Sequence, residues 1–231
     1  MHVKPIRTAL FRPKQSLEPF LVDHLPRLHE KDVVVVTSKI VALAQGRVVP
    51  NGAGAKEEWI RRESERVIST PWCALTLKDS HWCPNAGIDE SNADGSLILW
   101  PRDPFGVARR LRRKLMRHYR IQHLGVLITD SRIFPLRVGV TGVALGYAGF
   151  HGLRDYRGTL DLFGRALMMT QTNIADALAT AAVLVMGEGE EQTPLAVIRR
   201  APIEFCNKVD PSELRMDPQQ DLFAPVFRAD K

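Results

Sequence analysis

The sequence predicts a protein in which helices pack on mixed β-sheets. Residues 32–39 read Asp-Val-Val-Val-Val-Thr-Ser-Lys, and residues 124–131 read Leu-Gly-Val-Leu-Ile-Thr-Asp-Ser. Short apolar runs bounded by polar residues are typical of strands that are buried on both faces. Residues 104–119 and 172–186 instead place their apolar side chains along one side of a helix. We therefore expect helices and strands to share a core.

The other elements follow from the same patterns. Further strands are predicted at 73–77, 96–100, 139–149 and 195–198, and further helices at about 16–28, 40–44 and 57–69. The helix at 57–69 would bury Trp59, Ile60 and Val67, and the helix at 172–186 would bury Ala175, Leu178, Ala179, Ala182 and Met186. We expect one domain over residues 1–206, or two intimate subdomains within it. A polar, loosely held tail is expected over 207–231.

Composition excludes several classes of protein. The chain has 231 residues, of which 45% are hydrophobic and 25% charged, as in ordinary globular proteins. No apolar run reaches the roughly 18–20 residues that span a bilayer, and the N-terminus lacks the apolar core of a signal peptide. Cys73, Cys83 and Cys206 have no metal-binding spacing. Free thiols favour a cytoplasmic location, with no membrane partner.

The net charge of +6 comes in good part from the predicted helix at 104–119. Its apolar stripe is Val107, Ala108, Leu111, Leu115 and Tyr119, and its basic residues are Arg109, Arg110, Arg112, Arg113, Lys114, Arg117 and His118. The basic side chains would form either a nucleic-acid surface or a solvated helix face. No aromatic platform accompanies them, so we favour the solvated face and expect no nucleic-acid partner.

Three separate loops carry acidic side chains. Asp89 lies in the turn-forming stretch 83–92, Asp130 and Ser131 end a predicted strand, and Glu188 lies between two glycines in 186–194. Mg²⁺ and similar hard cations bind a few such oxygens together with substrate phosphate. We hypothesise that these loops meet, although the stretch 83–92 taken alone is more typical of an ordinary turn.

The hydroxyl-rich turn after the valine run has two interpretations. Thr37, Ser38 and Lys39 precede a helical segment, an arrangement that often aims backbone N–H groups at a phosphate. Thr and Ser are also good N-caps for any helix. From these residues alone we favour the cap.

Several blocks in series resemble the coenzyme F420-0:γ-glutamyl ligase family. They are Val-Val-Thr-Ser-Lys-Ile-Val (35–41), Gly-Arg-Val-Val (46–49), Asn-Ala-Gly-Ile-Asp-Glu-Ser-Asn (85–92), Asp-Pro (103–104), Leu-Ile-Thr-Asp-Ser (127–131), Gly-Thr-Leu-Asp-Leu-Phe-Gly-Arg (158–165) and Val-Met-Gly-Glu-Gly (185–189). Their order and spacing agree over about residues 33–200. The block at 85–92 is the most specific of them.

The resemblance implies an α+β fold, an intertwined homodimer and a GTP-dependent ligase that uses Mg²⁺ or Mn²⁺. Such a ligase adds the amino group of L-glutamate to a carboxylate through an acyl phosphate. The acceptor would be F420-0 or a related compound such as a folate-like pterin. The expected partners are therefore the small molecules glutamate, nucleotide and acceptor, together with a second copy of the chain.

The resemblance also assigns site residues position by position. It implies that Asp89 and Asp130 bind one metal ion, and that Ser131 and Glu188 bind a second. The implied nucleotide-binding residues are Ser38, Lys39, Asn92, Met186, Gly187, Glu188, Gly189, Glu190, Glu191, Gln192 and Thr193.

Three positions depart from the family pattern. Leu43 stands where the family has a lysine that contacts the nucleotide. Of the family's usual Gly-Arg, Pro, aromatic and Arg residues, the stretch 132–137 keeps only Pro135 and Arg137. Residues 8–11 read Thr-Ala-Leu-Phe in place of a Leu-Pro pair. Losing a cation from a phosphate site costs about 1–3 kcal/mol. The alternative hypothesis is therefore a ligand-binding homologue that kept the fold but lost or changed the ligase activity.

Overall fold

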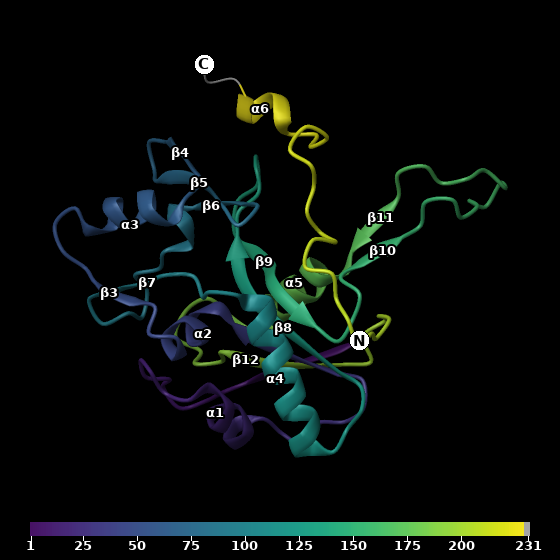
Figure 1. The fold of residues 1–231 in the computed structure, drawn as a ribbon, viewed down its shortest axis with the longest axis horizontal. Helices are drawn as coiled ribbons and strands as arrows, with labels where there is room; N and C mark the ends of the chain where they lie inside the picture. Colours follow the sequence, from purple (N-terminus) through teal and green to yellow (C-terminus); the bar gives the residue numbers. More distant parts are fainter. Residues whose placement is uncertain (229–231) are drawn as a thin grey trace.

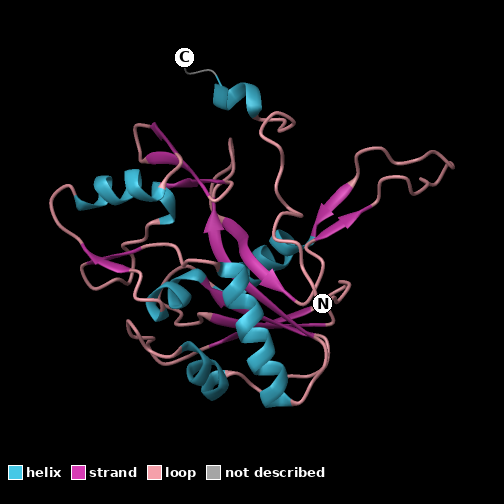
Figure 2. Cartoon of the chain, in the orientation of Figure 1, coloured by secondary structure: helices cyan, strands magenta, loops and turns pink. Residues whose placement is uncertain are grey.

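A central five-stranded sheet organises the chain, in the order β1–β12–β2–β8–β9 (Figures 1 and 2). The structure is a computed structural model that describes residues 1–228. The strands are β1 (His2–Ile6), β12 (Leu195–Arg199), β2 (Asp32–Thr37), β8 (Leu124–Arg132) and β9 (Thr141–Ala148). Strands β2 and β8 are parallel, and the other neighbours are antiparallel. The prediction of mixed sheets with packed helices is confirmed, and β1 is a strand that the sequence did not predict.

Helices cover both faces of this sheet. Val34 and Val36 belong to a core cluster with α1 (Leu17–His24), α2 (Ser38–Ala44) and α4 (Pro104–Tyr119). Val33 and Val35 belong to the opposite cluster, which α5 (Ile174–Met186) completes. Successive side chains of a strand point to opposite faces. An unbroken valine run is therefore required where both faces are covered.

Strand β9 lies close to a helix on each face, which explains its glycines. A Cβ on Gly142 would lie 2.3 Å from the backbone of Ala179 in α5, and one on Gly146 would lie 2.5 Å from the Phe105 nitrogen in α4. The predicted buried stripe of α5 is confirmed residue for residue. Its small residues allow close contact with a strand of the same chain.

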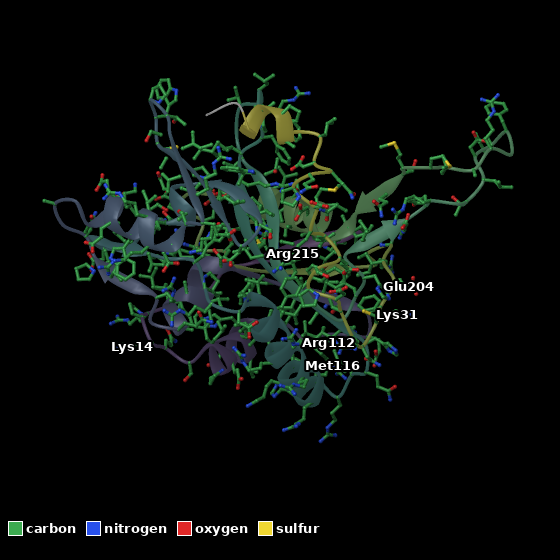
Figure 3. All side chains as sticks on the ribbon, turned by 45° about the horizontal axis from the view of Figure 1, so that its top comes forward. Lys14, Lys31, Arg112, Met116, Glu204 and Arg215 are labelled. Carbon is green, nitrogen blue, oxygen red and sulfur yellow. The ribbon has the colours of Figure 1, made fainter. Side chains whose placement is uncertain are left out.

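Helix α4 begins as predicted, because Asp103 Oδ1 accepts a hydrogen bond of 2.9 Å from the Gly106 N–H. The expectation that Arg112 lies on the solvated face is wrong. Arg112, which is labelled in Figure 3, is 8% exposed. It donates to the Leu124 carbonyl at 2.8 Å and to Asn207 Oδ1 at 3.0 Å. A buried guanidinium is tolerated there because its donors find oxygen partners.

A second, smaller layer lies beside the sheet. It contains β3 (Val48–Pro50), α3 (Ala55–Glu63), β4 (Arg66–Ser69), β5 (Ala74–Lys78), β6 (His81–Pro84), a 3₁₀ turn (Asn85–Gly87) and β7 (Ser96–Ile98). We call α3 with β4–β6 the bracket. The predicted helix at 57–69 ends six residues early, because 66–69 pairs with β5 instead. Val67 is accordingly 41% exposed, whereas Ile60 is buried as predicted.

Two segments extend from the core. The ribbon of β10 (Leu153–Asp155) and β11 (Gln171–Asn173) carries a loop at 156–170 that reaches away from the body (Figure 1). The tail ends in α6 (Ala224–Arg228). The expectation of a loosely held tail fails for its first part, because Glu213 Oε1 accepts hydrogen bonds from the Tyr147 hydroxyl (2.6 Å) and the Gly152 N–H (2.7 Å).

Within residues 1–228, no helix combines the length and the apolar character needed to cross a membrane. Cys73, Cys83 and Cys206 are all free.

Candidate active site

One cavity of about 330 Å³ collects every site residue that the sequence singled out. Its walls include Ser38, Lys39, Asp89, Asn92, Asp130, Ser131, Met186, Gly187, Glu188, Gly189, Glu190, Glu191, Gln192 and Thr193. The predicted convergence of the three acidic loops is therefore found within a single chain.

Strand register explains how three of the segments meet. Thr37 pairs with Thr129 across the parallel strands β2 and β8, so Ser38, directly after β2, and Asp130, near the end of β8, lie at the same end of the two strands. Strand β12 runs antiparallel to β2, with Leu195 opposite Val36, so the segment before β12 starts from that edge. The Thr37 N–H donates to the Pro194 carbonyl at 3.0 Å and closes the junction.

Asp89 reaches the cavity through the turn at 83–92. Asn85 Oδ1 accepts from the Ala74 N–H at 3.1 Å, and the Ala86 N–H donates to the buried Thr76 hydroxyl oxygen at 2.8 Å. Ala86 is fully buried with a φ of 57°, where a larger side chain would not fit. Asp89 then pairs with Ile98 in an isolated bridge, which fixes the direction of the chain.

Lys39 holds the Asp89 carboxylate. Its ammonium lies 2.7 Å from Asp89 Oδ2 and donates to the carbonyl (3.1 Å) and the hydroxyl (3.0 Å) of Ser91. Burial raises the pKa of Asp89, but the hydrogen bond and charge of Lys39 and the Ser91 donors outweigh it, so the net pKa is lowered. Asp89 is thus a carboxylate at neutral pH.

Asp130 has the opposite balance. Burial raises its pKa from 3.8 to about 6, and the negative charge of Asp89 adds to this effect. Hydrogen bonds from the Ser131 N–H (2.8 Å to Oδ1), the Trp100 indole and the Ser38 hydroxyl act against it. These three donors show a carboxylate that is held in place but crowded by a second negative charge.

The loop at 187–193 brings Glu188 to the cavity. Partial burial raises the pKa of Glu188; the Ser131 hydroxyl and Lys39 oppose this rise, and Asp89 and Glu191 reinforce it. The Gly189 N–H donates to Glu191 Oε2 at 2.8 Å. Gly187 has a φ of 79°, and a Cβ there would collide with the Glu191 carboxylate, so glycine is needed at that position.

The interpretation of Thr37 and Ser38 as a helix cap is not confirmed. Thr37 occupies the N-cap position of α2, yet its side chain makes no capping hydrogen bond. Ser38 is buried at 6% exposure, and its hydroxyl is directed to Asp130. The turn therefore contributes to the cavity more than to the helix end.

The donor set fits a hard divalent cation. The described wall has five carboxyl groups, from Asp89, Asp130, Glu188, Glu190 and Glu191, and a single cationic side chain, Lys39. No three His, Cys, Asp or Glu side chains in residues 1–228 are close enough to form a metal cage by themselves. Ser131 and substrate oxygens would have to complete the coordination, as is common for Mg²⁺.

One side of the cavity wall is apolar. Leu10, Phe11, Ile40 and Leu43 line it, so the departures at 8–11 and at Leu43 both face the ligand space. Sequence reasoning missed Trp100, which was assigned only to a strand end. No signal in the sequence distinguishes an indole that reaches a carboxylate from one that fills a core.

Comparisons with known proteins point to one family. The sequence profile of the family described as F420-0:Gamma-glutamyl ligase matches residues 5–200. Coenzyme F420:L-glutamate ligase of Haloarcula marismortui is 34% identical, with 94% of this chain and 93% of the relative covered. The enzymes of the same name from Methanopyrus kandleri (35%; 92% and 92%) and Methanothermobacter thermautotrophicus (36%; 76% and 77%) are also similar.

The matched region contains β2, β8, β9 and β12 of the central sheet, the bracket and all the loops that line the cavity. A profile match over most of the chain, with relatives above 30% identity, shows common descent. The chain belongs to the F420-0:Gamma-glutamyl ligase family.

Proposed function

We propose that this protein is an acid–amino-acid ligase that joins L-glutamate to a carboxylate of F420-0 or a related acceptor, with GTP as co-substrate. The name shared by the relatives, Coenzyme F420:L-glutamate ligase, supports the reaction class. A folate-like pterin remains a second candidate acceptor, because residues 132–136 differ from the family pattern. The three free thiols are compatible with the reducing cytoplasm in which we place the enzyme.

The acidity of the cavity is the observation that carries the proposal. A nucleoside triphosphate is polyanionic, and one lysine cannot balance both its charge and that of five carboxyl groups. The nucleotide therefore enters favourably only together with divalent cations. We assign Asp89 and Asp130 to one Mg²⁺ or Mn²⁺ ion, and Ser131 and Glu188 to a second. Such ions offset charge on the transferring phosphoryl group and align its oxygens.

The reaction needs an activated carboxylate, because a carboxylate is a poor acyl donor. In the proposed sequence, an oxygen of the acceptor carboxylate attacks the γ-phosphorus of GTP, GDP leaves and an acyl phosphate forms. The glutamate amine then attacks the acyl carbon, and it loses a proton as phosphate leaves. Lys39 would bind phosphate oxygens, and the glycines of the 187–189 segment would let backbone N–H groups approach them.

We also propose a homodimer. The loop of the β10–β11 ribbon carries large apolar side chains with little cover, including Leu162 at 99% and Phe163 at 87% exposure. Exposed apolar groups of this size mark interaction surfaces. A second copy of the chain is the partner that would cover them.

The test is a turnover assay with GTP or ATP, Mg²⁺ or Mn²⁺, L-glutamate and F420-0. We expect a glutamylated product and one phosphate per bond, both dependent on nucleotide and metal. A parallel reaction with a folate-like acceptor determines acceptor choice. If neither acceptor gives a nucleotide-dependent product, the ligase proposal is wrong.

The second candidate is a binding protein without turnover, which the presence of Leu43 in the cavity wall favours. Calorimetry separates the two candidates, because a binder would take up nucleotide or cofactor in the presence of metal and release no phosphate.

A further inference from the structure

Trp100 lines the cavity beside Asp130. Its side chain is 5% exposed, and its indole N–H donates a hydrogen bond to Asp130 Oδ2. The Ser131 N–H donates to the other oxygen, Oδ1, at 2.8 Å. Each carboxylate oxygen thus has a fixed donor, the Ser38 hydroxyl is a third donor to the group, and the remaining acceptor capacity is available to the cavity.

The bracket fixes the indole ring. A Cβ on Gly87 would lie 2.1 Å from the Trp100 indole nitrogen, so only glycine lets the ring pack at this position. The His81 ring meets the Trp100 ring edge-on, with 5.8 Å between centroids. The Lys78 ammonium lies 5.8 Å from the Trp100 ring centroid, within cation–π range.

A buried ion cluster holds this arrangement together. The Arg47 guanidinium donates to the Trp100 carbonyl at 3.1 Å and to Glu63 Oε2 at 2.7 Å, and Lys78 also pairs with Glu63. Glu63 lies at the end of α3 and Lys78 at the end of β5, so both side chains belong to the bracket. A continuous set of contacts therefore joins the bracket to Asp130.

We propose that Trp100 is a positioning residue through which the bracket orients the Asp130 carboxylate for a divalent cation. The inference rests on the proposed function, because it takes Asp130 as a metal ligand. Groups that hydrogen-bond to a ligand fix its orientation, and their loss typically weakens metal binding about 10–100-fold. The indole N–H also draws some electron density from the carboxylate, which lowers its metal affinity slightly. We expect the loss of a fixed orientation to lower the metal affinity by more than the loss of this donor raises it.

Trp100→Phe tests this by keeping an aromatic ring and removing the N–H. Trp72→Phe is the matched control, because Trp72 is 93% exposed and does not line the cavity. We expect Mn²⁺ affinity, measured from the free-ion electron paramagnetic resonance signal, to fall about tenfold in Trp100→Phe. The control should bind Mn²⁺ as the wild type does. In turnover, Trp100→Phe should raise the Mg²⁺ concentration at half-maximal rate and largely recover at saturating Mg²⁺.

A second measurement does not depend on the variant being stable. The chain has four tryptophans, so a ¹⁵N-labelled wild-type sample gives four indole signals. The signal of Trp100 should shift on addition of Mg²⁺, whereas that of Trp72 should not. Two results would overturn the inference and leave the proposed function standing. In the first, the wild type binds metal but its Trp100 signal does not shift; in the second, Trp100→Phe binds metal with the wild-type affinity. Absence of metal binding by the wild type in the presence of nucleotide would overturn both.

Discussion

The two sides of the cavity are built differently. On one side, Asp130 lies in β8 and Ser38 directly follows the parallel strand β2, and the turn at 83–92 fixes Asp89. On the other side, Leu10 and Leu43 come from an irregular N-terminal segment and the short helix α2. The departures at 8–11 and at Leu43 lie on the second side, whereas the departure at 132–136 lies outside the cavity wall. The comparison teaches that the cavity oxygens follow the family pattern where strand register and a hydrogen-bonded turn fix the backbone, and that the pattern changes in the less regular part of the wall.

The largest expected effect is on the oxygen-rich side. Asp89→Asn removes a charge that Lys39 and the proposed metal both use, and we expect kcat/KM to fall on the order of 10³-fold, equivalent to several kcal/mol of charge stabilisation. Asp94→Asn removes the same charge from an exposed position of the same segment that does not line the cavity. Steady-state kinetics on both variants gives the answer. Equal, small losses in the two would show that the oxygen-rich wall is not catalytic.

The second effect is a pH dependence of metal binding. Burial raises the pKa of Asp130 to about 6, so protons compete with the cation below that pH. The apparent Mn²⁺ affinity should be constant above about pH 6 and should fall about tenfold per pH unit below it. This fall ends at the pH where Asp130 also binds a proton in the Mn²⁺ complex.

The same shift affects folding stability with a definite sign. The folded chain holds the Asp130 proton more tightly than the unfolded chain, whose pKa is near 3.8. This group's contribution to the free energy of unfolding is therefore fully present below about pH 4 and is lost as the pH rises to about 6. Urea titrations of wild type and Asp130→Asn across this range measure it; an identical slope in both would assign the effect to other groups.

The third prediction concerns the apolar side. Leu43 is one helical turn beyond Lys39, so Leu43→Lys places a second ammonium along the same face of α2. We expect the Kd for GTP with Mg²⁺ to fall about tenfold, because one charge-assisted phosphate contact is gained.

Leu222→Lys adds the same charge at an exposed site in the tail and controls for general attraction. Calorimetry compares the two variants. Tighter binding in both, or in neither, would mean that Leu43 does not border the phosphate path.

The smallest effect distinguishes the two interpretations of Ser38. If the hydroxyl serves Asp130, Ser38→Ala should weaken Mn²⁺ binding a few-fold and raise the pKa of Asp130 further, because a donor to the carboxylate is lost. Loss of a true N-cap would instead cost about 1 kcal/mol of stability. Chemical denaturation and Mn²⁺ titration of the same variant separate these outcomes. A stability loss with unchanged metal affinity would restore the cap interpretation.

The periodicity of the sequence predicted the elements that are buried most regularly. The four valines required a strand covered on both faces, and the α5 stripe was identified completely. Prediction failed where local pattern and tertiary partner disagree. The charged stretch at 57–69 resembles a helix throughout, but pairing with β5 converts its end to a strand. The basic residues beside Arg112 in the sequence suggested an exposed side chain. Its burial is explained only by its hydrogen bonds to the Leu124 carbonyl and to Asn207, which are distant in the sequence.

The sequence by itself determined which residues carry the oxygens of this site, because a series of short blocks specifies Asp89, Asp130, Ser131 and Glu188 by type and order. It could not determine that they share one cavity, since that depends on the register between β2, β8 and β12. Nor could it reveal Trp100, whose role exists only once the bracket folds against the sheet. The physical reason is that hydrogen bonds between residues far apart in the chain leave no periodic trace in it.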